Sequence, residues 1–137
     1  MTFESGLYQF LIQNPGVAGL VGNRIFRSLM PKETDLPAVV FYVAATTSVY
    51  SMQGASGLRA KRVAFDSYAR KYSDAVAVSD AIRGLLQSFK GSLPDGTMVN
   101  GCIVQNDMDF PYEAGTSGYV HRRLLEVEIW HNDSVKL

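Results

Sequence analysis

The sequence predicts an α+β fold: a mostly antiparallel sheet of about five strands, two main helices packed on one face of it, and two long β-hairpins. Three observations support this prediction. Between Leu58 and Phe89 a strand pattern runs directly into an amphipathic helix pattern, several other segments alternate in polarity with a period of two, and glycine-rich turns separate neighbouring strands. The predicted order is helix, strand, hairpin, helix and hairpin, which favours both helices lying on the same side of the sheet.

Length and composition limit the classes of protein to which the chain can belong. Its 137 residues are typical of one domain, so residues 1–137 are predicted to share a single core that needs no disulfide. The one cysteine, Cys102, makes a reducing cytoplasm the expected compartment. The first residues lack the pattern of a signal peptide and no apolar run approaches the ~18 residues of a membrane span, so a soluble chain without a membrane partner is expected.

The N-terminal segment is predicted to be helical over residues 3–13. Apolar side chains recur there at helical spacing: Phe3, Leu7, Phe10 and Leu11. The pair Asn14-Pro15 ends this helix, because proline disfavours helical geometry in the residue before it, and a short helical turn over residues 16–21 follows. A brief strand is then predicted over residues 24–27.

The first long hairpin is predicted after a loop over residues 30–36. Residues 38–50 form the most strand-like run in the chain and are expected at the centre of the sheet. A tip without charge, residues 51–57, connects this run to a return strand over residues 58–70. Apolar and polar residues alternate in the return strand, so one of its faces is expected to be wetter than the other.

The principal helix is predicted from Ser73 to Phe89. Its apolar positions fall on one face at helical spacing: Ala75, Val78, Ile82, Leu85, Leu86 and Phe89. Ser73 is the expected N-cap, Asp74 favours the positive end of the helix dipole, and Gly91 is expected to close the C-terminus.

The second long hairpin follows a turn predicted over residues 91–96. A strand over residues 98–108, with a bulge at Gly101, leads to a second long tip over residues 110–118. The return strand, residues 119–131, places alternate apolar side chains on one face: Leu125, Val127 and Ile129.

No group of residues has the pattern of a catalytic, cofactor or metal site. His121 and His131 lie about 33 Å apart along an extended strand, so one metal ion cannot bind both, and each is expected at the surface. Cys102 is expected to be a small buried side chain rather than a nucleophile. Asp107 and Asp109 share one face of a strand end, where they could hold a divalent cation through water or keep the hairpin soluble.

Local charge and the two tips carry more information than the net charge, which is zero and gives no whole-molecule attraction to nucleic acid. Basic residues gather near the first return strand and open the last one: Arg59, Lys61, Arg62, Arg70, Lys71, Arg122 and Arg123. They form either a solvated face or an edge that meets DNA or acidic groups of another copy, such as Asp107, Asp109 and Glu113. The tips carry apolar residues that favour contact with another chain or fold back over the sheet: Val49, Tyr50, Met52, Phe110, Pro111 and Tyr112.

Four ordered motifs run through the chain: Leu20-Val21-Gly22-Asn23-Arg24-Ile25-Phe26, Leu36-Pro37-Ala38-Val39-Val40-Phe41, Val63-Ala64-Phe65-Asp66-Ser67-Tyr68-Ala69 followed by Tyr72, and Glu126-Val127-Glu128-Ile129-Trp130. In this order and spacing they resemble the small tail-completion proteins of long-tailed bacteriophages over nearly the whole chain. Ser67 departs from the more apolar residue expected there, which leaves the subfamily open. The resemblance implies tail terminators: subunits that form a ring, often a hexamer, on the last ring of the tail tube and stop its polymerisation.

A structural assembly protein, not an enzyme, is therefore expected, with no cofactor and no metal. The resemblance implies further copies of the chain in a hexameric ring, the tail tube protein and head-completion or connector proteins as partners, with DNA passing through the ring without specific contacts. Its expected place is the tail or neck of the virion, and the host cytoplasm during assembly. The candidate interface residues are Tyr50, Met52, Arg59, Lys61, Arg62, Asp107, Asp109, Phe110, Tyr112, Arg122 and Arg123. Two alternatives remain, a head-closure or neck ring on the connector side and a small-ligand-binding or enzymatic α+β module.

Overall fold

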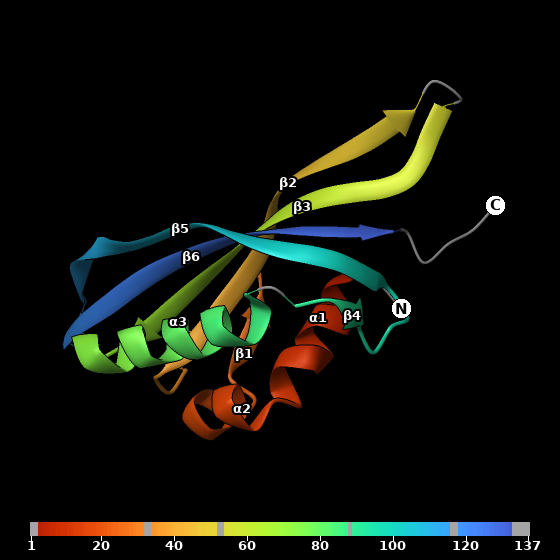
Figure 1. The fold of residues 1–137 in the computed structure, drawn as a ribbon. Coiled ribbons are helices and arrows are strands. Elements are labelled where there is room, and N and C mark those ends of the chain that lie inside the picture. Colours follow the sequence, from red (N-terminus) through yellow and green to blue (C-terminus); the bar gives the residue numbers. More distant parts are fainter. Residues whose placement is uncertain (1–2, 32–33, 52–53, 88, 116–117, 133–137) are drawn as a thin grey trace.

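The computed structural model describes residues 3–31, 34–51, 54–87, 89–115 and 118–132. The elements in chain order are α1 (Phe3–Ile12), α2 (Pro15–Val21), β1 (Ile25–Arg27), β2 (Ala38–Ser51), β3 (Gly54–Ala69), α3 (Tyr72–Leu86), β4 (Gly91–Ser92), β5 (Met98–Gly115) and β6 (Gly118–Asn132). The strands form one sheet in the order β1-β2-β3-β6-β5-β4, in which only the β1–β2 pair is parallel. The three helices lie on the same side of this sheet (Figure 1).

This architecture confirms the predicted α+β class, with a sixth strand in place of about five. The additional strand is β4, which lies where a turn is predicted and pairs with the start of β5 over two residues. The central strands are β3 and β6, so the expectation that the run from Ala38 is central is wrong. β2 lies nearer the edge, because the parallel strand β1 covers only its first part.

Both hairpins are paired much closer to their tips than the sequence predicts. β2 runs to Ser51 and β3 begins at Gly54, while β5 continues to Gly115 through a segment expected to be loop. Register shifts near the tips absorb the extra residues, one between Phe110 and Glu113. The two hairpins extend from opposite ends of the sheet. Figure 1 shows them as two arms that point away from each other, the β2–β3 arm and the β5–β6 arm.

The core lies between the sheet and the three helices. Leu125, Val127 and Ile129 of β6 are almost fully buried on the helix side, as their alternation predicts. They meet the buried side of α3, which includes Val78 and Ile82. The other large, fully buried side chains come from α1, α2, α3, β2 and β3: Leu7, Leu11, Val17, Val21, Val39, Phe41, Val63, Phe65 and Leu86.

The caps of α3 differ from the predicted ones, whereas the break before α2 is as predicted. α3 begins at Tyr72, so Ser73 lies inside the helix and is not its N-cap; Lys71 takes that place without a side-chain bond. The helix ends before Gln87, and Gly91 lies beyond it in β4. The break at Asn14 is as predicted, and its side chain accepts hydrogen bonds from the first backbone amides of α2.

Two polar residues expected at the surface are buried. His131 of β6 is 2% exposed and stacks on Phe3 of α1 with ring centroids 4.7 Å apart, because its strand position faces the helices. Asp66 of β3 is 3% exposed on the opposite side of the sheet, so the face predicted to be wetter is also covered at this point.

Candidate functional site

A network of polar and charged side chains joins the β5–β6 arm to α3. We call it the Arg123 network, and it consists of Tyr72, Arg83, Asp107, Asp109 and Arg123. The Arg123 Nε lies 3.0 Å from Asp107 Oδ1, and its Nη1 donates to Asp109. Helix α3 contributes Arg83, 3.5 Å from Asp107, and the Tyr72 hydroxyl, which donates to Asp109 at 2.8 Å. The network therefore ties helix and arm together.

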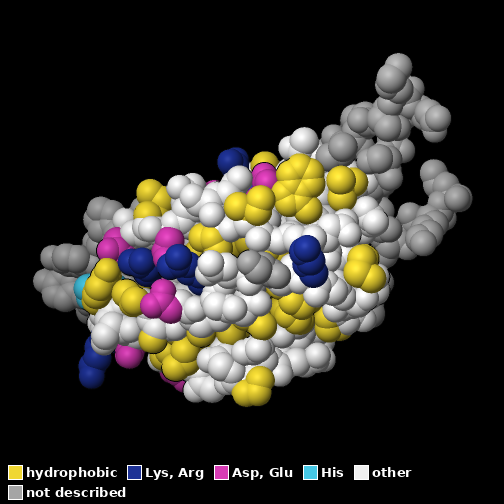
Figure 2. Space-filling view, in the orientation of Figure 1, with side chains coloured by type: hydrophobic (Ala, Val, Ile, Leu, Met, Phe, Trp, Pro, Cys, Tyr) yellow, Lys and Arg dark blue, Asp and Glu magenta, His cyan; other side chains and the backbone are white. Residues whose placement is uncertain are grey.

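Charges in the Arg123 network are balanced, with two carboxylates and two guanidinium groups. The hydrogen bond from Tyr72, followed by those from Arg123, lowers the pKa of Asp109. The same bond to Asp109 raises the pKa of the Tyr72 hydroxyl, because the carboxylate stabilises its proton. Figure 2 shows basic and acidic side chains interleaved where α3 begins, toward the left of the view. Each carboxylate that could hold a cation thus already faces an arginine of its own chain.

A second set of ion pairs lies on the side of the sheet without helices. The Arg122 Nη2 lies 2.9 Å from Asp66 Oδ2, which gives the buried carboxylate a charged donor. Further along, Arg62 lies 3.7 Å from Glu126, which also accepts a hydrogen bond from Asn106. These contacts join β3, β6 and β5 across the sheet, so they stabilise the paired strands.

The basic residues of the first return strand do not line an edge, because β3 lies between β2 and β6. Neighbouring positions face opposite sides: Lys61 lies over the Phe3 ring and 3.9 Å from Glu4 on the helix side, whereas Arg62 lies on the other side. Arg59 pairs with His131 across the β3–β6 ladder. A contact of these residues with another chain stays a prediction.

The tip residues among the interface candidates lie largely outside the described part of the structure. Met52 is outside it altogether, and the side chains of Tyr50, Phe110 and Tyr112 are outside it as well. Their backbones place Tyr50 opposite Ala55, and Phe110 opposite Arg122. Their role in contacts with other chains stays a prediction.

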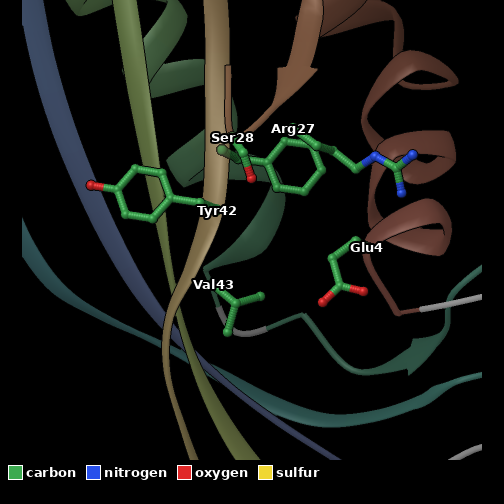
Figure 3. Close-up of a pocket in the computed structure, with 6 residues that line it drawn as sticks. Glu4, Arg27, Ser28, Tyr42 and Val43 are labelled. Carbon is green, nitrogen blue, oxygen red and sulfur yellow. The ribbon is translucent and has the colours of Figure 1, made fainter.

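Two shallow hollows flank β1. The larger, of about 590 Å³, lies between α1 and the start of β2. It is lined by Glu4, Arg27, Ser28, Phe41, Tyr42 and Val43 (Figure 3). A smaller hollow of about 380 Å³ shares Arg27 and reaches Leu29. Figure 3 shows the Glu4 carboxylate and the Val43 side chain on either side of an open space, with Arg27 as the second ionisable residue of the lining.

The remaining candidates for chemistry have structural positions. Cys102 is buried as predicted, and its burial raises the pKa of its thiol to about 11, which leaves little thiolate near neutral pH. Within the described residues, no group of three His, Cys, Asp or Glu side chains is placed to hold a metal ion. Over those same ranges, no helix has the length and apolar character needed to cross a membrane.

Sequence reasoning missed several members of these networks. The sequence gives no sign of Arg83, and it gives Tyr72 and Glu126 only as parts of family motifs and not as ion-pair or hydrogen-bond partners, because their partners are distant in the sequence. One signal was available: Asp66 directly follows Phe65 in a strand with buried neighbours, and a carboxylate in such a place is usually paired.

Comparisons with known proteins give one family match and a structural match that shows the same fold. The family model described as "Tail completion protein gp17" matches residues 5–132. A chain from a solved structure titled "Virion of native gene transfer agent (GTA) particle" has the same fold, with a TM-score of 0.75, at 15% sequence identity. That match covers 96% of this chain and 95% of the other. A comparison with curated proteins finds no match.

Proposed function

The chain belongs to the family of tail completion proteins, and from this premise we propose that it forms a ring that caps the tail tube, ends its polymerisation and joins the tail to the head connector. Its role is structural, in the assembly of a virion. The observation that supports the proposal most directly is the family match, which spans residues 5–132.

Physical features of the molecule support a ring. A closed ring needs a heterologous interface, in which one patch of a subunit meets a different patch of the next. The described structure offers unlike surfaces, since the two arms point to opposite ends of the sheet and only one sheet face carries helices (Figure 1). Acting by such contacts, and not by catalysis, also agrees with the charge networks, in which acidic groups face basic partners.

In detail, the proposal is a single domain that assembles as a hexamer on the last ring of the tube. Its partners are the tail tube protein on one side and a head-completion or connector protein on the other, with DNA passing through the opening. The finished protein then resides in the tail or neck of the virion, after assembly in the host cytoplasm.

Native mass spectrometry and electron microscopy of the purified chain, with and without tail tubes, test this proposal. We expect closed rings of one stoichiometry, and caps at one end of the tubes. Only monomers under both conditions would contradict it. Binding to portal or adaptor rings with none to the tube would favour the alternative, a head-closure or neck ring, and a co-purifying small molecule would point to a ligand-binding module.

A further inference from the structure

The outer edge of β2 is uncovered over most of its length. β1 pairs with β2 only at three positions, the last of which is Arg27 opposite Phe41. One more hydrogen bond, from the Ser28 amide to the Phe41 carbonyl at 2.9 Å, ends this contact. Beyond Phe41, β2 continues to Ser51, and no strand in the described ranges pairs with its outer side. The backbone groups that point outward there are open to another chain.

The local conformation after β1 keeps this edge open. Ser28 has a φ of 69°, a left-handed conformation that costs an ordinary residue roughly 1 kcal/mol or more. The Leu29 amide then donates to the Arg27 carbonyl at 2.8 Å, so the chain leaves β2 at once. Leu29 is 80% exposed beside the edge, and the hollow of about 590 Å³ next to Val43 leaves space there (Figure 3).

β2 carries neither charge nor proline, two of the features that normally protect an exposed edge, and its one irregularity near the stretch is a register shift with β3 between Val43 and Ala45. Natural edge strands carry lysine, proline or inward-pointing charges that prevent pairing with other chains. The 14 residues of β2 include no charged residue and no proline. The four positions after Val43 are exposed and small: Ala44, Ala45, Thr46 and Thr47. This edge is therefore suited to main-chain pairing with another strand.

The opposite edge of the sheet has a matching stretch. β4 covers β5 only at Met98 and Val99. From Gly101 to Asn106 the outer side of β5 has no partner among the described strands and no charge, and Ile103 is 55% exposed. A register shift between β5 and β6 lies within this stretch, between Val104 and Asn106. After Asn106, β5 contains aspartates and a proline, which disfavour pairing with another strand.

Strand directions make these two stretches compatible. β2 is antiparallel to β3, β3 to β6, and β6 to β5, so β2 and β5 run in opposite directions. A second copy placed beside the first with the same face outward brings β5 of one copy against β2 of the next as an antiparallel pair, the arrangement used by most of the sheet. Because the two edges differ, the contact is heterologous and can repeat around a ring.

We propose that the β2 edge from Val43 to Thr47 pairs, main chain to main chain, with the β5 edge from Gly101 to Asn106 of a second copy of this chain. The inference rests on the proposed ring, and it names the contact that joins neighbouring subunits. It makes the sheet continuous from one subunit to the next.

Disulfide cross-linking of the full chain tests this pairing. In a Cys102→Ala background, Thr46→Cys is combined in turn with Ile103→Cys, Val104→Cys or Gln105→Cys, and the assembled protein is mildly oxidised. We expect a ladder of covalent multimers from at least one double variant and none from any single variant. Covalent dimers from Thr46→Cys alone would show β2 pairing with β2 and overturn the proposal.

The remaining outcomes separate this inference from the ring itself. Rings in the native mass spectrum without cross-links in any double variant overturn the strand pairing and leave the ring intact. Absence of rings from the unmodified chain, alone and with tubes, overturns both.

A second variant tests the open edge without cysteines. Thr46→Lys adds a solvated charge to the β2 edge at an exposed position, and we expect ring formation to weaken at least 10-fold while the circular dichroism spectrum is unchanged. Gln87→Lys adds the same charge at an exposed position after α3 and serves as the matched control. Equal assembly of both variants would count against the pairing.

Discussion

At the scale of single residues, buried polar groups are held by partners that lie far away in the sequence. Asp66 and Arg122 are separated by 56 positions, yet they form the 2.9 Å contact that compensates for burial of the carboxylate. The attraction within such a pair adds less to the stability of the fold than is lost when one partner is removed and the other stays buried without it.

We expect Asp66→Asn to lower the free energy of unfolding by about 2 kcal/mol, because the partly exposed Arg122 then loses the charged acceptor that the buried carboxylate provides. Urea unfolding measures the change. Asp35→Asn, at an exposed position, is the control and should change it by less than about 0.5 kcal/mol. An equal, small effect of both substitutions would mean that the pair is unimportant for stability.

The Arg123 network gives stability a dependence on acidic pH. The pKa of Asp109 in the folded protein lies below its ordinary value of 3.8, mainly through the Tyr72 hydrogen bond. The ionised group therefore stabilises the fold above about pH 4, and this contribution is lost as the pH falls through the lower, folded-state value.

We expect Asp109→Asn to be less stable than the parent chain at pH 7, with the difference narrowing below pH 4, where the parent also loses the charge. Urea midpoints of both chains, measured from pH 7 to pH 3, check this. Tyr72→Phe should reproduce part of the effect, since it removes the largest cause of the lowered pKa. A difference in stability between Asp109→Asn and the parent chain that stays constant with pH would contradict this prediction.

At the scale of elements, close contacts between segments decide which substitutions the fold accepts. Gly6 of α1 lies directly against Asp95 in the turn between β4 and β5, so a Cβ added there would overlap the carboxyl group. Asp95 cannot easily move away, because it accepts hydrogen bonds from the Thr97 amide and hydroxyl at 3.0 and 2.6 Å.

We expect Gly6→Ala to lower the free energy of unfolding by about 1–3 kcal/mol, as in other overpacked positions. Gly19→Ala in α2 is the matched control: its Cβ would meet nothing within 4 Å, and alanine should stabilise the helix by up to about 1 kcal/mol. Thermal melting of both variants distinguishes the two cases. A stabilising effect of Gly6→Ala would contradict the prediction, because it would show that Asp95 moves away from the added Cβ at little cost.

At the scale of the whole molecule, the surfaces available to other chains govern assembly. Most large apolar side chains that the described structure exposes strongly lie near the two sheet edges: Leu29 at one, and Met98, Ile103 and Met108 at the other. The remaining two are Leu20 and Tyr72, on helices. This distribution agrees with contacts between copies through the edges of the sheet.

We expect the double variant Arg59→Glu and Arg62→Glu, which changes one basic residue on each side of β3, to weaken ring formation while the fold is retained. Loss of the exposed Arg62–Glu126 pair itself should cost less than about 1 kcal/mol. Lys71→Glu with Lys90→Glu makes the same change of net charge at exposed positions and is the control. Sedimentation velocity reports the assembly, and unchanged rings in the first variant would exclude Arg59 and Arg62 from the interface.

The sequence by itself determined the types of the longer elements and the helix-facing side of α3 and β6. Local periodicity is enough for that: the spacing of Val78 and Ile82 predicts a helix, and the alternation of Leu125 and Val127 predicts a strand, because apolar burial acts on every residue of an element. The order of motifs also resembled the family to which the chain belongs.

Only the tertiary structure decided which distant residues meet. The burial of His131 against Phe3, the Arg123 network and the short β4 depend on how α1, α3 and the arms pack over the sheet, which no local pattern encodes. The uncovered edge of β2 likewise follows from where β1 stops. Pairing between strands is a long-range property, so the sequence shows that a strand exists without showing which of its edges remains open.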